Sequence, residues 1–269
     1  MVNVLKEEIS RIKELLFIKE EDEGFGKYMD STYLKTPEQA GISDDETDLI
    51  IFDTIKDAIE HNMKLVMIRP EYVKTAREFI DSQGANVLVG TVIGFPNGDD
   101  SLGEKLDEAI QAIQDGVDEL DFVVDYKAFK DGELDTIKYE VSEGTAIGID
   151  AGKSVKWIIE SAALTSEQIA ELTKLISKIV IETVGEEKAR NVFVKTSTGF
   201  FTPEDGSPGG ATIDAVSTMS QNAGPLKVKA SGGIYSKGDV LSMVNAGASR
   251  IGTSAAKEIM LGQQTDKDY

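Results

Sequence analysis

Short apolar runs and longer segments of helical periodicity alternate along the chain from residue 28 onward. The run Val192-Phe193-Val194 is continuously apolar, which is typical of a strand buried on both faces of a parallel sheet. Segments such as residues 102–113 carry apolar side chains every three or four positions, which is typical of amphipathic helices. Eight strand-like runs occur, at residues 28–30, 64–68, 86–93, 119–124, 154–160, 191–195, 226–231 and 249–252.

Helical segments follow these strands, and none is assigned between the fourth and fifth. They lie at residues 43–59, 73–79, 102–113, 166–179, 211–219, 238–245 and 254–260. Alternating strands and helices predict a parallel sheet. Eight such units in a chain of 269 residues predict an α/β fold, a closed (β/α)8 TIM barrel in which residues 1–269 form one domain. A doubly wound open sheet is the alternative, but no Gly-x-Gly-x-x-Gly sequence follows the first strand.

An additional element precedes the barrel. Leu5, Ile9, Ile12 and Leu16 recur at helical spacing, with charged residues of both signs between them. This pattern predicts an N-terminal helix within residues 1–22 that packs on the barrel. A helix on a membrane surface is less consistent with the mixed charge, because such helices usually carry a basic polar face.

Composition narrows the chemistry that is available. The net charge of −20 argues against a nucleic-acid partner, which needs clustered Lys and Arg. The absence of cysteine excludes disulfides and thiolate chemistry, and because His61 is the single histidine, we expect neither a metal site nor a Ser-His-Asp triad. No stretch reaches the ~20 apolar residues of a membrane span. We therefore expect a cytoplasmic protein without a membrane partner or a cofactor.

Charged residues stand where the expected strands end. In TIM barrels the functional groups come from the carboxyl ends of the strands, so charge at these positions needs a chemical reason. The residues at these ends are Asp30, Arg69, Asp121, Glu160, Lys195, Lys229 and the turn Gly252-Thr253-Ser254.

Two of these residues, Lys195 and Lys229, end consecutive strands. Neighbouring parallel strands lie ~4.8 Å apart, so the two ammonium groups would be close together. Two unit charges about 5 Å apart at an effective dielectric constant of about 20 repel by roughly 3 kcal/mol, or about two pKa units. Partial burial lowers a lysine pKa further. The pair therefore predicts one lysine near neutrality, able to attack a carbonyl and form a Schiff base.

Asp121 lies within the apolar run Leu120-Asp121-Phe122. A carboxylate among such neighbours costs free energy unless it is paired. We expect Asp121 to move protons during carbonyl chemistry, to form a structural ion pair with one of the lysines, or to do both.

Glycine and hydroxyl residues follow the sixth, seventh and eighth strands. Glycines let the backbone approach an anion closely, and barrels often bind phosphate at the loops after strands seven and eight. We therefore expect a small phosphorylated substrate, held mainly by backbone N–H groups. The residues expected around it are Thr198, Gly199, Ser231, Gly232, Gly233, Gly252, Thr253 and Ser254.

Six segments match one known family in its own order along the chain: residues 91–96, 118–121, 155–160, 193–200, 228–234 and 250–254. On these segments the chain resembles the deoxyribose-phosphate aldolases, which are class I aldolases that form a Schiff base. The resemblance implies reversible cleavage of 2-deoxy-D-ribose 5-phosphate to D-glyceraldehyde 3-phosphate and acetaldehyde, without a metal. It also implies that Lys195 forms the Schiff base, that Lys229 lowers its pKa, and that Asp121 relays protons.

Three features depart from the family pattern. Asp30-Ser31-Thr32 stands where Asp-His-Thr is usual, and Met67-Ile68-Arg69-Pro70 stands where Cys-Val-Asn-Pro is usual. Met67 and Arg69 would alter the mouth of the pocket. Residues 181–190 are also longer and more charged than usual before the sixth strand.

Two alternatives to this function stay open. One is a Schiff-base barrel lyase that acts on a different phosphorylated sugar. The other is a catalytically silent barrel that binds a sugar phosphate or serves as an assembly subunit. The sequence also leaves the oligomeric state open, with a homodimer or a higher homo-oligomer among the options.

Overall fold

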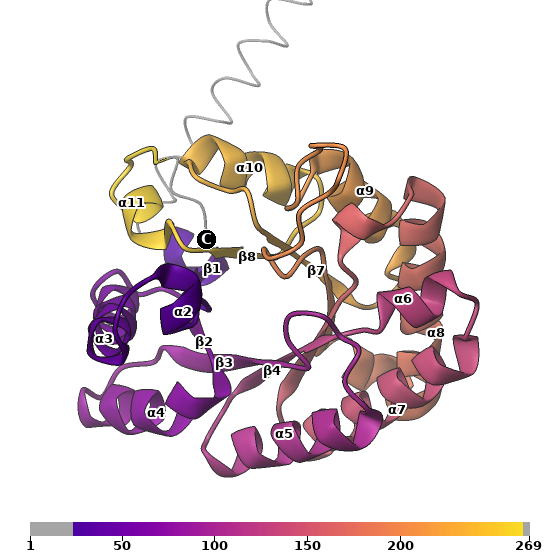
Figure 1. Ribbon diagram of the computed structural model, residues 1–269, viewed down its shortest axis with the longest axis horizontal. Helices are drawn as coiled ribbons and strands as arrows, with labels where there is room; N and C mark the ends of the chain where they lie inside the picture. Colours follow the sequence, from indigo (N-terminus) through magenta and orange to yellow (C-terminus); the bar gives the residue numbers. More distant parts are fainter. Residues whose placement is uncertain (1–23, 266–269) are drawn as a thin grey trace, which may run out of the picture.

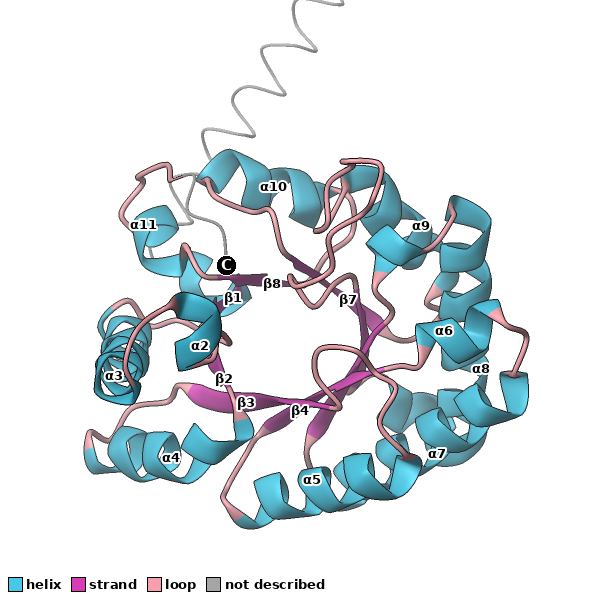
Figure 2. Cartoon of the chain, viewed as in Figure 1, coloured by secondary structure: helices cyan, strands magenta, loops and turns pink. Residues whose placement is uncertain are grey.

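Eight parallel strands close into a barrel in the order of the sequence (Figures 1 and 2). The computed structural model describes residues 24–265. Strand β1 pairs with β2 on one side and with β8 on the other, which leaves the sheet without an edge. The strands are β1 Met29–Thr32, β2 Leu65–Ile68, β3 Leu88–Ile93, β4 Glu119–Val123, β5 Ser154–Ile158, β6 Val192–Lys195, β7 Lys227–Ser231 and β8 Arg250–Thr253.

Helices form a ring outside the strands (Figure 1). The α-helices are α2 Pro37–Ala40, α3 Asp44–Glu60, α4 Val73–Ser82, α5 Leu102–Gln114, α6 Tyr126–Lys130, α7 Leu134–Asp150, α8 Ser166–Ala189, α9 Ile213–Asn222, α10 Lys237–Asn245 and α11 Ala256–Met260. Three short 3-10 helices complete the described elements: η1 Phe25–Tyr28, η2 Pro70–Tyr72 and η3 Ser161–Ala163.

This architecture confirms the predicted TIM barrel, and the pairing of β1 with β8 excludes the open sheet. The predicted N-terminal helix lies outside the described residues and stays a prediction. Among the helices of residues 24–265, none combines the length and the apolar character needed to cross a membrane.

The sequence analysis assigned no helix between the fourth and fifth strands, and the structure places α6 and α7 there. Glycines explain the omission, because α7 lies close against the sheet at Gly144 and Gly148. A Cβ at Gly144 would come within 2.8 Å of Trp157, and a Cβ at Gly148 within 2.3 Å of Val155. At the two positions where α7 packs on β5 it therefore has glycine instead of an apolar side chain. The apolar periodicity that predicts a helix is weak in this segment for that reason.

Several helix boundaries differ from the prediction. Helix α8 continues to Ala189 rather than ending near residue 179, so the charged segment 181–190 is largely its last part, which a non-helical residue interrupts at Gly185 (φ 79°). Helix α9 begins at Ile213 rather than at residue 211. Helix α11 begins at Ala256, so Ser254 lies in the turn before it.

The barrel interior divides into an apolar part and a charged part. Side chains that alternate along each strand point to the helices or to the barrel axis. Leu65, Met67 and Val92 form a small apolar cluster with Leu34, separate from the large core between strands and helices. Buried charged side chains lie on β1, β4, β5, β6, β7 and β8. TIM barrels usually fill this space with branched apolar residues, so the charges point to function.

A buried lysine joins the loops that follow β3 and β4. Lys105 of α5 is buried, and its Nζ donates to the carbonyl oxygens of Gly98 at 2.5 Å and Val123 at 2.9 Å. The same Nζ pairs with Glu140 of α7, whose other carboxylate oxygen accepts from the Asp125 backbone N–H at 3.0 Å. Burial raises the pKa of Glu140, and Lys105 opposes that rise. Lys105 therefore holds together two loops and two helices beside the barrel mouth.

Replacing Lys105 by Met should lower the free energy of unfolding by about 3–5 kcal/mol, because Glu140 is then buried without its cation. Denaturant unfolding measures this as a lower midpoint at nearly constant slope. The double variant Lys105→Met/Glu140→Leu should regain most of the loss, since no unpaired charge remains buried. An unchanged midpoint in the single variant would contradict the role of Lys105.

Candidate active site

A carboxylate on β4 is shared by lysines from the next three strands. Asp121 Oδ2 lies 3.0 Å from Nζ of Lys195 on β6 and 3.0 Å from Nζ of Lys229 on β7. Asp121 Oδ1 pairs with Lys156 on β5. None of the four side chains is more than 3% exposed. The structure thus brings together the three residues selected from the sequence and adds Lys156.

The register of the strands explains this contact. Asp121 pairs with Lys156, and Lys195 pairs with Lys229. The sequence analysis placed Asp121 at the end of its strand, which is wrong: it is the third of the five residues of β4. It still reaches Lys195, the last residue of β6, because the strands of a barrel are staggered along its axis.

A second set of ion pairs adjoins the first. Arg250 at the start of β8 pairs with Asp30, and its Nη1 lies 3.0 Å from Glu119 Oε1. Lys229 Nζ lies 2.7 Å from Asp30 Oδ2, and Lys156 Nζ lies 2.7 Å from Glu119 Oε2. Asp30 was expected at the end of its strand, but it is the second residue of β1 and is fully buried in these pairs. The two sets therefore form one buried network.

Within the described residues, the network contains one more cation than carboxylate. Lys156, Lys229 and Arg250 each contact two carboxylates. Lys195 contacts one, that of Asp121. Loss of the Lys195 proton therefore removes the excess charge at the cation with the fewest partners.

The pKa of Lys195 is lowered to about 8, first by burial and then by the charge of Lys229, while Asp121 acts in the opposite direction. The repulsion between lysines predicted from the sequence is thus present, but burial is the larger cause. The pKa of Lys229 is instead raised, because the attraction of Asp121 and Asp30 outweighs its burial. The pKa values of the two lysines therefore shift in opposite directions: Lys195 loses its proton near pH 8, whereas Lys229 stays protonated there.

The pKa of Asp121 is held well below its usual range. Burial alone would raise it, but the charges of Lys156, Lys229 and Lys195 together reverse that effect. Asp121 therefore remains an ionised acceptor for the lysines around it.

The sequence analysis missed Lys156 and Arg250. Lys156 lies in the run Val155-Lys156-Trp157, which is as apolar as the run around Asp121. The argument used for Asp121, that charge in a buried strand needs a partner, would have selected Lys156 as well. Arg250 is the first residue of β8, so the criterion of charge at the carboxyl end of a strand does not select it.

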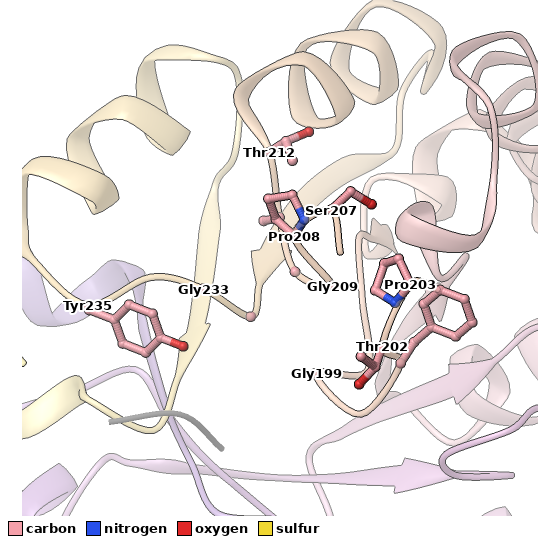
Figure 3. A pocket seen from close by; sticks show the side chains of 13 residues that line it. Gly199, Thr202, Pro203, Ser207, Pro208, Gly209, Thr212, Gly233 and Tyr235 are labelled. Carbon is pink, nitrogen blue, oxygen red and sulfur yellow. The ribbon is translucent and has the colours of Figure 1, made fainter. Parts of the chain in front are cut away.

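A pocket of about 670 Å³ opens between the loops that follow β6 and β7 (Figure 3). Gly199, Gly232 and Gly233 line it, with φ angles of 85°, 82° and 72° that favour glycine. Gly210 packs so closely on the other loop that a Cβ there would lie 2.4 Å from the Gly232 carbonyl. Among the described lining residues none carries a charged side chain. A ligand here would meet backbone, hydroxyl and ring atoms.

The remaining residues expected around a phosphate lie outside this lining. Ser231 and Thr253 are buried, and their hydroxyls donate to backbone carbonyls at 2.6 and 2.7 Å. Gly252 lies against Lys229, where a Cβ would come within 3.0 Å of the lysine Cε. Ser254 is exposed in the turn after β8. Within the part of the chain that the structure describes, no group of three or more His, Asp or Glu side chains is arranged to hold a metal ion.

The candidate site has two features: a lysine of lowered pKa at the end of β6, and a pocket whose first lining residue, Gly199, follows that lysine by four residues in the chain. Residues 27–262 match the model of the DeoC/LacD family aldolases. The chain belongs to this aldolase family. The family's Schiff-base chemistry requires a lysine that is partly neutral, which is the property that burial gives to Lys195.

Named relatives agree with this family. A deoxyribose-phosphate aldolase of Staphylococcus saprophyticus is 40% identical over 246 residues, which cover 91% of this chain and 99% of the relative. One of Thermococcus gammatolerans is 38% identical over 237 residues, covering 88% of this chain and 95% of the relative.

Solved structures extend the likeness to the fold. The deoxyribose phosphate aldolase of Aeropyrum pernix, described as having a unique tetrameric structure, superposes with a TM-score of 0.72 at 27% identity, covering 89% of this chain and 91% of its own. A putative deoxyribose-phosphate aldolase of Coccidioides immitis gives a TM-score of 0.71 at 30% identity, covering 88% of this chain and 84% of its own.

Replacing Lys229 by Leu should raise the pKa of Lys195 above about 8, because a positive neighbour is lost and Asp121 has one cation fewer to balance. Only the neutral amine attacks a carbonyl, so the pH at which Lys195 reacts half-maximally should move upward. The measurement is the rate of borohydride-trapped adduct formation with acetaldehyde as a function of pH.

Lys227→Leu supplies the matched control, because Lys227 lies on the same strand with its side chain exposed. This variant should leave the profile where it is in the wild type. A profile that is also unchanged in Lys229→Leu would refute the contribution of Lys229.

Proposed function

We propose that this protein is a class I aldolase that reversibly cleaves 2-deoxy-D-ribose 5-phosphate to D-glyceraldehyde 3-phosphate and acetaldehyde. The observation that carries the proposal is the buried contact between Lys195 and Asp121, beside a pocket built from glycine turns. The named relatives, each a deoxyribose-phosphate aldolase over most of its length, support this substrate.

Lys195 is the nucleophile in this mechanism. Its neutral Nζ adds to the aldehyde carbon C1 of the open-chain sugar, and loss of water leaves a protonated Schiff base. That cation draws electrons from the bond between C2 and C3 while the C3 hydroxyl gives up its proton. The bond breaks and D-glyceraldehyde 3-phosphate leaves. The two carbons that remain form an enamine, which takes a proton at C2 before hydrolysis frees acetaldehyde and the amine.

Asp121 and Lys229 manage the protons of these steps. Asp121 Oδ2 contacts both ammonium groups at 3.0 Å, so a proton that leaves Lys195 has an acceptor within hydrogen-bond distance. Lys229 stays protonated because of Asp121 and Asp30, and its charge favours the neutral form of Lys195. The cluster therefore supplies a nucleophile that is partly neutral and an ionised carboxylate that relays protons.

The pocket between the loops after β6 and β7 is the proposed phosphate site. Its glycine turns leave backbone N–H groups accessible, and helix α9 begins at its wall with the N-cap residue Thr212. Dipoles of this kind hold an anion without a lysine or arginine in the lining. The end of β8, with Gly252 and Thr253, and Ser254 in the turn after it remain the proposed third side of the site.

The test is a cleavage assay with 2-deoxy-D-ribose 5-phosphate, combined with borohydride trapping and peptide mass spectrometry. The wild type should release acetaldehyde and carry the reduced adduct on Lys195. Lys195→Met should lose the adduct and reduce kcat/KM on the order of 10³-fold or more, since the covalent step is removed. The control Lys178→Met replaces an exposed lysine of α8 and should keep both the adduct on Lys195 and the wild-type kcat/KM.

The outcomes separate the alternatives. An adduct on Lys195 with another phosphorylated sugar, and no cleavage of this one, would favour a different Schiff-base lyase. If no aldehyde or sugar phosphate forms an adduct, both enzyme functions are ruled out and the catalytically silent barrel is the remaining alternative. Self-association into a homo-oligomer stays a prediction for this chain, which light scattering tests against the mass of 29.1 kDa per chain.

A further inference from the structure

Glu160, two residues after the end of β5, is a buried carboxylate that the mechanism above does not use. Its side chain is 1% exposed. Its backbone has φ 49° and ψ 64°, a left-handed conformation that is uncommon for residues other than glycine. Among the described non-glycine residues, Asn62 alone shares this positive φ. Strained backbone and buried charge at one position often mark a functional constraint.

The carboxylate of Glu160 holds the start of the loop that follows β6. Glu160 Oε2 accepts a hydrogen bond from the Thr198 backbone N–H at 3.1 Å and a second from the Thr198 hydroxyl. The hydroxyl oxygen of Thr198 in turn accepts from the Phe200 backbone N–H at 3.1 Å. One carboxylate thus fixes the turn Thr198-Gly199-Phe200. We call these three hydrogen bonds the Glu160–Thr198 clasp.

The clasp sits at the point where the pocket begins. Gly199, the residue after Thr198, is the first residue of the pocket wall, which continues through residues 201–212 (Figure 3). The rings of this wall rest on the other side of the barrel mouth. Phe200 packs edge to face on Phe95 at 5.1 Å, and Phe201 on Tyr126 at 6.3 Å between ring centroids.

The clasp uses only one oxygen of the carboxylate. Glu160 Oε1 is buried and has no hydrogen-bond partner among the described residues. Burial raises the pKa of Glu160 to about 7, against the hydrogen bonds from Thr198 and the charge of Lys195. The titratable groups that face it are Lys195 from β6 and Tyr126 from α6. Burying a carboxylate at this position costs free energy. Because a carboxylate accepts stronger hydrogen bonds than a neutral oxygen, its presence indicates that a strong hydrogen bond to Thr198 matters for function.

We propose that Glu160 is a positioning residue for phosphate binding: through Thr198 it holds the wall of residues 199–212 in the conformation that binds the phosphate group of the substrate. This inference rests on the proposed function, since phosphate is the ligand assigned to that pocket. It also links the two halves of the site, because the Ile159 N–H donates to the Lys195 carbonyl at 3.0 Å. The end of β5 thereby supports both the nucleophile's strand and the pocket wall.

The first experiment compares a phosphorylated with an unphosphorylated substrate. Glu160→Gly removes the carboxylate and suits the left-handed backbone, so it separates loss of the clasp from backbone strain. With 2-deoxy-D-ribose 5-phosphate, KM should rise about 10- to 100-fold, the size of one to two hydrogen bonds to a charged group, while kcat changes little. With 2-deoxy-D-ribose, kcat/KM should stay within about 3-fold of the wild type.

Three further variants test the route through Thr198, and a fourth is a control. Thr198→Val should raise KM for the phosphorylated substrate in the same direction, and the double variant Glu160→Gly/Thr198→Val should add little to Glu160→Gly alone. Glu160→Gln keeps an acceptor oxygen and should restore most of the affinity. Asn62→Gly changes the other positive-φ residue, between α3 and β2, and should leave both substrates unaffected.

Equal losses for the phosphorylated and the unphosphorylated substrate would overturn the proposal, because a merely structural residue would affect both. Additive effects of Glu160→Gly and Thr198→Val would overturn the route through Thr198. A second measurement does not require turnover: calorimetric titration of inorganic phosphate into the wild type and Glu160→Gly. Weaker phosphate binding in the variant supports the clasp even if another sugar phosphate proves to be the substrate. Equal binding, or none to the wild type, overturns it.

Discussion

The buried charges of this barrel are organised around one carboxylate that three lysines share. Asp121 contacts Lys156, Lys195 and Lys229, and a second set of ion pairs ties two of these lysines to further carboxylates. Burying so many charges is favourable only when each has partners. Lys195 has the fewest, and it is the lysine whose pKa is lowered. Its reactivity is therefore a property of the whole network.

The chain itself connects this network to the pocket. Lys195 is the last residue of β6, and Gly199, the first residue that lines the pocket, follows it by four residues. On the opposite side of the network, Gly252 leaves room for the Lys229 side chain, which keeps the second lysine within reach of Asp121.

The strands and the buried pair Lys195 and Lys229 could be predicted from the sequence, because buried parallel strands are continuous apolar runs and these two lysines interrupt two of them at corresponding places. The pairing of Arg250 with Asp30 and Glu119 could not be predicted. It depends on the stagger between β8, β1 and β4, which no local pattern encodes. Helix α7 was missed because glycine, rather than a large apolar residue, packs against β5.

The central claim is that burial within this network, rather than lysine repulsion alone, lowers the pKa of Lys195 to about 8, so that part of this lysine is neutral near physiological pH. The most direct measurement is an NMR titration of protein labelled with ¹³C at lysine Cε, in which the Lys195 signal is identified by its loss in Lys195→Arg. The account predicts a Lys195 midpoint near a pKa of about 8 and a Lys229 signal that stays in its protonated position well beyond it. A Lys195 midpoint near 10.4, the value of a free lysine, would contradict the account.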